Sequence, residues 1–329
     1  KQGMDFGVYL SPWDMHDERY GTDAYNDYFC NQLTELLTNY GEIFEVWFDG
    51  AKGSNAKKFE YDWQRYYDLI RKLQPKANIA ICGPDIRWVG NEGGKSRKSE
   101  YSVVPCALRE ADRIMALSQQ DENQASSLQK YNQMDEDLGS RKILEKNAYL
   151  CWFPAEVDVS IRKGWFFHEK DNRNSKSAKK LFKIYLNSVG NNCTLLLNIP
   201  PNAQGEIHKK DVKNLEKLGK MINNITQNPI VYQELGELTK DNGFIDFTFN
   251  DVRKVNYVVL QEDIANGQRV ELFDLYIQKA NGKFKRVYKG TVIGAKKIVN
   301  LKGKKAKGIR FVIRQSRSTP IIKSVGIYE

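Results

Sequence analysis

Apolar residues in the first two thirds of the chain follow two alternating patterns. Short apolar runs, typical of buried strands, are separated by longer stretches in which apolar residues recur every three or four positions, as on one face of a helix. This alternation predicts a parallel α/β sheet, and candidate catalytic groups at several strand ends favour a (β/α) barrel of the TIM type. The predicted strands cover residues 6–11, 43–49, 77–83, 148–153 and 192–200, and the predicted helices cover 22–41, 61–75, 177–190 and 211–225.

The pattern changes after about residue 226. Short alternating strands follow one another, with turns that include Asn281-Gly282, a strong hairpin signal. They predict an antiparallel β-sandwich, so we expect two domains, a catalytic barrel at 1–226 and a C-terminal sandwich at 227–329. The polar region 105–146 is expected to form a long loop with one or two helices. The sandwich strands are predicted at 244–249, 255–261, 271–278, 283–290, 308–315 and 323–329.

The composition of the 329-residue chain excludes several classes of protein. No apolar run approaches the roughly 18 residues of a membrane helix, so we expect no membrane span. The five cysteines and three histidines show no spacing typical of a metal site, so we expect neither a metal nor a cofactor. The formal net charge of +10 comes from Lys and Arg spread along the whole chain, without a nucleic-acid-binding motif. A basic surface is therefore favoured over nucleic-acid binding, and the sequence carries no signal of oligomeric state.

One predicted strand ends on a carboxylate. In the stretch GEIFEVWFDGAKG, alternation of side chains places Glu45, Trp47 and Asp49 on one face, the face that would line a barrel. Asp49 would then stand at the carboxyl end of the strand, where barrel enzymes carry their catalytic groups. An Asp in this position also commonly caps the following turn. On this strand alone the two interpretations are equally good.

Two further segments combine carboxylates with tryptophans. CGPDIRWVGNEGG follows a predicted strand and contains Trp88 and Glu92, and CWFPAEVDVSIRKGWFFH contains Glu156 and Trp165 on an expected loop. Sugar rings stack on aromatic faces, and two carboxyl groups acting on a glycosidic bond are the simplest chemistry for this set of residues. A glycine-rich turn with incidental charges is the alternative for the first segment. Neither segment contains a phosphate-binding loop, a serine-nucleophile elbow or a zinc-protease motif.

Several segments together resemble glycoside hydrolase family 29, the retaining α-L-fucosidases, over Phe6 to about Ile225. The resemblance is greatest to the branch that prefers α-1,3/1,4-linked fucose, and the C-terminal sandwich fits the family's β-domain more loosely. It implies a fucosylated glycan as substrate and an extracytoplasmic location: periplasmic, secreted or lysosomal. The segments are FGVYLSPWD, YGTDAYNDYF, FEVWFDGAKG, GPDIRWVGNEGG, WFPAEVDVSIRKGWFFH and SVGNNCTLLLNIPPNAQGEIH.

The resemblance also implies roles for individual residues. Asp49 of WFDG matches the nucleophile that forms a glycosyl-enzyme intermediate, and Glu92 of GNE matches the general acid/base of this branch, with Glu156 as the second candidate. Tyr9 and Trp47 match residues of the fucose pocket, and Trp165 is expected to form a wall of it. We expect the sandwich to brace the catalytic domain rather than to bind sugar.

One departure from the family concerns histidines. The family's first two barrel strands carry a His-His pair that holds the fucose hydroxyls, whereas this chain begins at what should be the third strand and contains no adjacent histidines. The resemblance therefore implies a barrel that is incomplete at its N-terminus. We expect little or no fucosidase activity from the chain alone, and the alternative to an enzyme is a glycan-binding protein without turnover.

Overall fold

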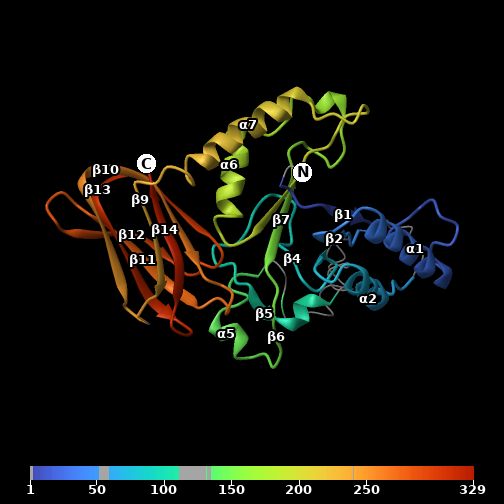
Figure 1. The fold of residues 1–329 in the computed structure, drawn as a ribbon, viewed down its shortest axis with the longest axis horizontal. Helices are drawn as coiled ribbons and strands as arrows, with labels where there is room; N and C mark the ends of the chain where they lie inside the picture. The colour runs from blue at the N-terminus through green and yellow to red at the C-terminus, as the bar shows by residue number, and fades with distance from the viewer. Residues whose placement is uncertain (1–2, 52–58, 111–130, 132–134, 240) are drawn as a thin grey trace. The chain divides into compact units, whose positions relative to one another are not determined.

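The computed structural model describes residues 3–51, 59–110, 131, 135–239 and 241–329 (Figure 1). The chain divides into two compact units, each formed from several segments. The first unit contains residues 1–90, 104–135 and 147–154, and the second contains 91–103, 136–146 and 155–329. Much of the expected loop at 105–146 lies outside the described residues.

Three parallel strands form the sheet of the first unit, in the order β1-β2-β3. Their register places Tyr9 beside Trp47, and Trp47 beside Ala80. The predicted strands and their parallel pairing are confirmed for this part of the chain. The strands are β1 (Gly7–Leu10), β2 (Glu45–Phe48) and β3 (Asn78–Ile81).

Two helices pack on this sheet through aromatic side chains. Helix α1 (Asp23–Asn39) and helix α2 (Trp63–Leu73) meet at Phe29 and Tyr66, whose ring centroids lie 4.6 Å apart. Phe48 of β2 is fully buried and contacts Trp63 edge-on, with centroids 5.8 Å apart. Both helices were predicted from their apolar spacing. The remaining elements of this unit are β4 (Arg87–Trp88), β5 (Val103–Pro105), the 3-10 helix η1 (Cys106–Arg109) and β6 (Leu150–Trp152).

The second unit contains a parallel strand pair and two long helices. Strands β7 and β8 pair with Glu156 opposite Thr194 and Ser160 opposite Asn198. An apolar cluster joins helices α6 and α7 to the C-terminal sheet, where Ile298 and Tyr328 complete it. The elements are β7 (Ala155–Ser160), β8 (Thr194–Asn198), α5 (Arg141–Leu144), the 3-10 helix η2 (Glu169–Asp171), α6 (Ala178–Asn187) and α7 (Lys209–Asn223).

The C-terminal part of the second unit is a large antiparallel sheet, as expected. Six strands pair in the order β12-β11-β13-β10-β14-β9. The two longest strands, β10 and β13, pair with each other on both sides of a register break between Thr248 and Arg253. The second half of β10 also pairs with β14, and the second half of β13 also pairs with β11. Strand β12 pairs with β11, and β9 pairs with β14. The strands are β9 (Val231–Glu237), β10 (Phe244–Glu262), β11 (Val270–Gln278), β12 (Phe284–Gly290), β13 (Lys297–Ser316) and β14 (Ile321–Tyr328).

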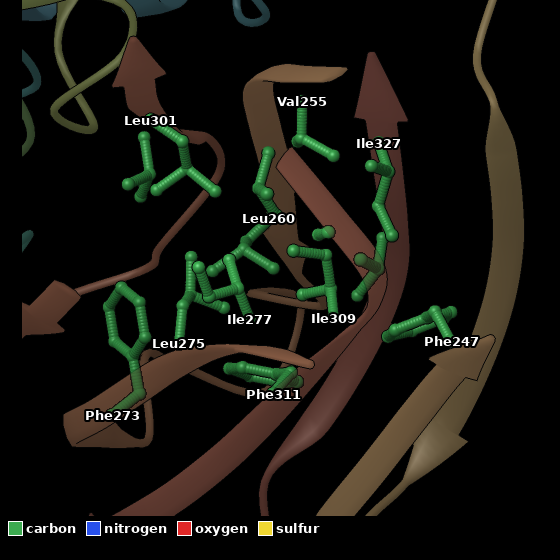
Figure 2. Close-up of a cluster of buried hydrophobic side chains, with 14 of the residues drawn as sticks. Phe247, Val255, Leu260, Phe273, Leu275, Ile277, Leu301, Ile309, Phe311 and Ile327 are labelled. Atoms are coloured by element: carbon green, nitrogen blue, oxygen red, sulfur yellow. The ribbon is translucent and has the colours of Figure 1, made fainter. Parts of the chain in front are cut away.

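The sheet folds over its own apolar face. Phe247 and Val255, from the two halves of β10, belong to the same buried cluster as Phe273 of β11 and Ile327 of β14. Figure 2 shows these side chains gathered between the strands. A register break of this kind lets paired strands bend, which brings side chains from both halves of β10 into one cluster. Burial of this cluster is the main source of stability of the sheet.

The structure corrects several sequence-based expectations. Residues Ala155–Ser160 form strand β7, not the loop expected around Glu156. The predicted strands at 244–249 and 255–261 are one strand, and β9 was not predicted at all. Lys304 and Lys305, which lie outside the predicted strands, belong to β13, where they pair with β10.

Candidate active site

The Asp49 carboxylate is held from both sides at the end of β2. Its Oδ1 accepts the backbone N–H of Ala51 at 2.8 Å, and its Oδ2 accepts the hydroxyl of Tyr9 from the neighbouring strand β1. Asp49 therefore does cap the turn that follows the strand, as the simpler interpretation expected. The second oxygen is fixed by a side chain 40 residues away in sequence, and a turn cap does not require this contact.

Tyr9 and Trp47 form an aromatic pair beside this carboxylate. Their rings stack with centroids 5.4 Å apart and an interplanar angle of 25°, and Tyr9 remains 58% exposed. Burial and the adjacent Asp49 both raise the pKa of Tyr9, so its hydroxyl stays protonated and able to donate. Glu45 lies on the same strand face, where desolvation raises its pKa. The predicted grouping of Tyr9, Trp47 and Asp49 is thus present in the first unit.

Glu92 lies on a tight loop of the second unit. Asn91 holds this loop, since its Oδ1 accepts from Gly93 N at 3.0 Å and its Nδ2 donates to Lys95 O at 3.0 Å. Gly94 has φ +70° and lies so close to Ile184 that an added Cβ would come within 3.0 Å of that side chain. The exposed side chain of Glu92 accepts a hydrogen bond at Oε2 from Trp165 Nε1, with a donor–acceptor distance of 3.2 Å. Two residues that the sequence analysis named separately are therefore in direct contact.

The loop that carries Trp165 is anchored to strand β8 by Asn198. The Asn198 amide donates to Trp165 O at 2.8 Å and to Ser160 Oγ at 3.0 Å. Ser160 Oγ in turn donates to Gly164 O at 2.7 Å, which closes the turn leading to Trp165. The side chains of Asn198 and Ser160 thus fix the backbone on which the indole is mounted.

A buried ion pair also holds the loop that carries Trp165. The side chains of Arg162 and Asp211 are both fully buried, with a shortest separation of 2.7 Å, and Arg162 also donates to Asn172 at 2.9 Å. The guanidinium lies 4.6 Å from the ring centroid of Phe167. Because Asp211 lies in the first turn of α7, the pair fixes the Trp165 loop to that helix.

The other named residues lie on strands. Trp88 is half-buried in β4 of the first unit. Glu156 and Asp158 are only 1% and 3% exposed within β7, so neither has the exposure of Glu92. Asp49 belongs to the first unit and Glu92 to the second.

The residues that support the Trp165 loop were missed by sequence analysis. Asn198 was visible as a polar residue at the end of a predicted strand, the same signal that singled out Asp49. The pairing of Arg162 with Asp211 links residues 49 positions apart, so no local pattern indicates it. Among the described residues no group of three or more His, Cys, Asp or Glu could hold a metal ion, and no described helix is long and apolar enough to cross a membrane.

The model of the alpha-L-fucosidase family matches residues 1–226 of the chain. The chain belongs to this family, glycoside hydrolase family 29. Alpha-L-fucosidase 1 of Arabidopsis thaliana is 34% identical over 99% of the chain and 66% of its own length. The family assignment suggested by the sequence motifs is thus confirmed.

Solved structures extend this family relationship. A Bacteroides ovatus protein is 45% identical, with a TM-score of 0.86 over 99% of this chain and 55% of its own. A Ruminococcus gnavus GH29 fucosidase solved in complex with fucose is 27% identical, with a TM-score of 0.80 over 100% of this chain and 72% of its own. The chain spans 66% and 64% of the length of the two curated relatives that it matches, and 55% of the Bacteroides ovatus chain.

Proposed function

We propose that the protein is a retaining exo-α-L-fucosidase that releases terminal α-1,3/1,4-linked L-fucose from glycans. Membership of the alpha-L-fucosidase family supports the reaction class. The observation that carries the assignment of the nucleophile is the double hold on Asp49, by the Tyr9 hydroxyl and the Ala51 N–H, beside the Tyr9–Trp47 stack. These contacts leave the carboxylate in a fixed orientation, as attack on a sugar carbon requires.

In the first step, an oxygen of Asp49 attacks the anomeric carbon of fucose. The bond to the leaving oxygen breaks as the carboxylic acid of Glu92 transfers its proton to that oxygen, and the fucosyl group is then bound covalently to Asp49. The Trp165 indole N–H donates to Glu92 and so restricts its rotation.

In the second step, the Glu92 carboxylate takes a proton from water as the water oxygen attacks the anomeric carbon. The bond to Asp49 breaks, fucose leaves with its original anomeric configuration, and both carboxyl groups return to their starting states. Trp47, Trp88 and Trp165 supply the aromatic faces against which the apolar side of the sugar packs. Tyr9 contributes an exposed ring as well as its hydrogen bond to Asp49.

The proposal includes an architecture and a location. The parallel strands with their helices belong to a (β/α) barrel of the TIM type, with residues 1–226 as catalytic domain and 227–329 as a bracing β-sandwich. The family's other members suggest an extracytoplasmic setting. The α-1,3/1,4 preference rests on the GNE motif around Glu92 and is tested by comparing fucosyl linkages.

The test measures hydrolysis of an aryl α-L-fucoside by the protein and by the Asp49→Ala variant. We expect Asp49→Ala to lose at least about 1,000-fold in kcat, because the covalent step has no nucleophile. Azide added to this variant should restore turnover and yield β-fucosyl azide, since the small anion occupies the space of the missing carboxylate. Asp85→Ala is the matched control, a carboxylate of the same unit whose contacts with Arg71 and Ile79 are structural.

Undiminished hydrolysis by Asp49→Ala overturns the nucleophile assignment. Labelling with a fluorinated fucosyl fluoride provides a second readout, because it traps the ester on the nucleophile, and digestion should recover the label on the peptide that contains Asp49. A label on another peptide would reassign the role.

A second proposal is that the chain binds fucosylated glycans with little or no turnover. It is supported by the sequence, in which His16, His168 and His208 stand apart, without the His-His pair implied by the family resemblance. Glycan-array binding together with no hydrolysis of the aryl fucoside would favour it. Robust hydrolysis by the 329-residue chain would refute it.

A further inference from the structure

Two cysteines of the first unit lie on paired neighbouring segments of the chain. Cys106 begins the 3-10 helix that follows β5, and Cys151 is the middle residue of β6, the strand that pairs with β5. The backbone N–H of Cys106 donates to Tyr149 O at 3.0 Å, which fixes the start of the helix against β6. This contact places Cys106 beside Tyr149, two residues along the chain from Cys151, and the Cys106 thiol contributes to the raised pKa of Cys151.

The two cysteines differ in their access to solvent. Cys106 is partly exposed, whereas Cys151 is only 8% exposed, and both are reduced in this structure. A soluble oxidant can therefore reach Cys106 first, while Cys151 is in place to complete the reaction. This is the arrangement of an attacking and a resolving cysteine.

We propose that Cys106 and Cys151 are a cross-linking site, which forms a disulfide bond when the protein meets a small disulfide oxidant such as glutathione disulfide. The Cys106 thiolate attacks one sulfur of the oxidant, forms a mixed disulfide and releases one glutathione thiolate. The Cys151 thiolate then attacks the Cys106 sulfur and releases the second glutathione. The two cysteine thiols lose two electrons and two protons in total. The glutathione disulfide takes up these electrons and protons and becomes two glutathione thiols.

The surroundings of Cys151 predict how the rate of closure depends on pH. Burial, together with the Cys106 thiol, raises the pKa of the Cys151 thiol to about 12, against the opposing effect of the guanidinium groups of Arg109 and Arg87. The resolving thiolate is therefore scarce at neutral pH, and closure should accelerate as the pH rises toward 9. Arg109 is held in place by its bond to Trp152 O at 2.6 Å.

The cross-link would connect two segments of the first unit, one before the chain passes into the second unit and one after it returns. Cys106 lies in residues 104–135 and Cys151 in residues 147–154, while the intervening residues 136–146 belong to the second unit. Closing this long loop removes conformational freedom from the unfolded chain, so the oxidised protein should unfold at a higher temperature than the reduced protein.

The experiment incubates the folded chain with reduced and oxidised glutathione at pH 8, quenches it with acid and alkylates it in denaturant. We expect a peptide pair linked through Cys106 and Cys151, with Cys30, Cys82 and Cys193 alkylated. The midpoint of thermal unfolding should rise by a few degrees and return to its starting value on reduction. The Cys151→Ser variant should stop at a glutathione adduct on Cys106.

The matched control is Cys193→Ser, which should form the same cross-link as the unaltered chain. Alkylation of all five cysteines after prolonged oxidation would overturn the proposal, as would a cross-link between any other pair. Neither readout uses fucosidase activity, so failure of the cross-link and failure of the proposed function are distinguished. Peptide mapping of the unaltered protein decides the question even where a serine variant folds poorly.

Discussion

The hydroxyl of Tyr9 donates to Oδ2 of Asp49, across the parallel pair of strands β1 and β2. The partner strand thus supplies a donor to the carboxylate that the turn residue Ala51 already holds through Oδ1. Tyr9 is paired with Trp47, and Asp49 follows the last residue of β2. The contact between Tyr9 and Asp49 therefore forms only when the two strands are paired. The pair therefore depends on the alignment of two strands.

Replacing Tyr9 with Phe keeps the stacked ring and removes the donor to Asp49. We expect kcat for an aryl α-fucoside to fall about 10- to 100-fold, because a hydrogen bond to a charged group contributes about 1.5 to 3 kcal/mol. Since Phe preserves the aromatic surface, KM should change much less. Tyr149→Phe, at a tyrosine that is 80% exposed, is the control. Equal kcat values for Tyr9→Phe and the control would show that the hydroxyl has no part in the reaction.

Replacing Asn198 with Asp should loosen the loop that carries Trp165. A carboxylate cannot donate to Trp165 O or Ser160 Oγ, so both bonds of the Asn198 amide are lost. We expect trypsin to cleave after the exposed Lys163 several times faster than in the unaltered protein. Asn223→Asp, at an exposed position at the end of α7, supplies the comparison. Identical cleavage rates would contradict the anchoring role of Asn198.

Removing one partner of the buried pair Arg162–Asp211 should be strongly destabilising. Both side chains are fully buried, so Asp211→Asn leaves an uncompensated guanidinium in the interior. The free energy of unfolding in urea should fall by about 3 to 5 kcal/mol. Glu329→Gln, which breaks an ion pair whose Arg253 and Glu329 side chains are 46% and 50% exposed, should cost less than about 1 kcal/mol. Similar losses in the two variants would refute this ranking.

Lys297 should make stability rise with pH in the alkaline range. Its side chain is 3% exposed and donates to Asn191 Oδ1 at 2.8 Å. Burial lowers the pKa of Lys297 to about 8, and Lys98 adds a smaller effect in the same direction. Cys193 and Glu100 oppose this shift more weakly than burial drives it. Between pH 8 and the ordinary 10.5, the folded state has released a proton that the unfolded state keeps. The free energy of unfolding therefore rises over this pH range by about 3 kcal/mol, at about 1.4 kcal/mol per pH unit.

The measurement compares urea unfolding of the unaltered protein and Lys297→Met at pH 7.5, 9 and 10.5. The difference in unfolding free energy between the two should shift in favour of the unaltered protein as the pH rises. Lys323→Met, at an exposed lysine of β14, controls for general charge effects. A difference that stays constant with pH would mean that Lys297 titrates alike in both states.

Local patterns were enough for the elements near Asp49. Apolar spacing predicted α1 and α2, and alternation placed Trp47 and Asp49 on one face of β2, because these signals depend on neighbours in sequence. Strand β7 was missed because Glu156 and Asp158 interrupt its apolar residues, although the whole strand is buried. The alternation was present in the sequence, but the polar side chains resembled those of a loop.

The side-chain contacts of the two candidate catalytic carboxylates are long-range. Trp165 reaches Glu92 across 73 positions, and Tyr9 reaches Asp49 across 40, so each pair becomes visible only when the strands are assembled. Strand ends and family motifs indicate the residues one by one, whereas their contacts depend on the three-dimensional fold. The same holds for the bend that joins the two halves of β10, since a register break depends on the partner strand.

That bend has a consequence for how the C-terminal sheet forms and fails. Because β10 and β13 stay paired with each other on both sides of the register break, and both halves of β10 contribute to one buried cluster, the halves of the sheet share a single core. Their pairing joins residues distant in sequence, so we expect this sheet to fold slowly, after much loop closure has been completed. It should also unfold in a single cooperative transition, so that the amide protons of all its strands exchange together.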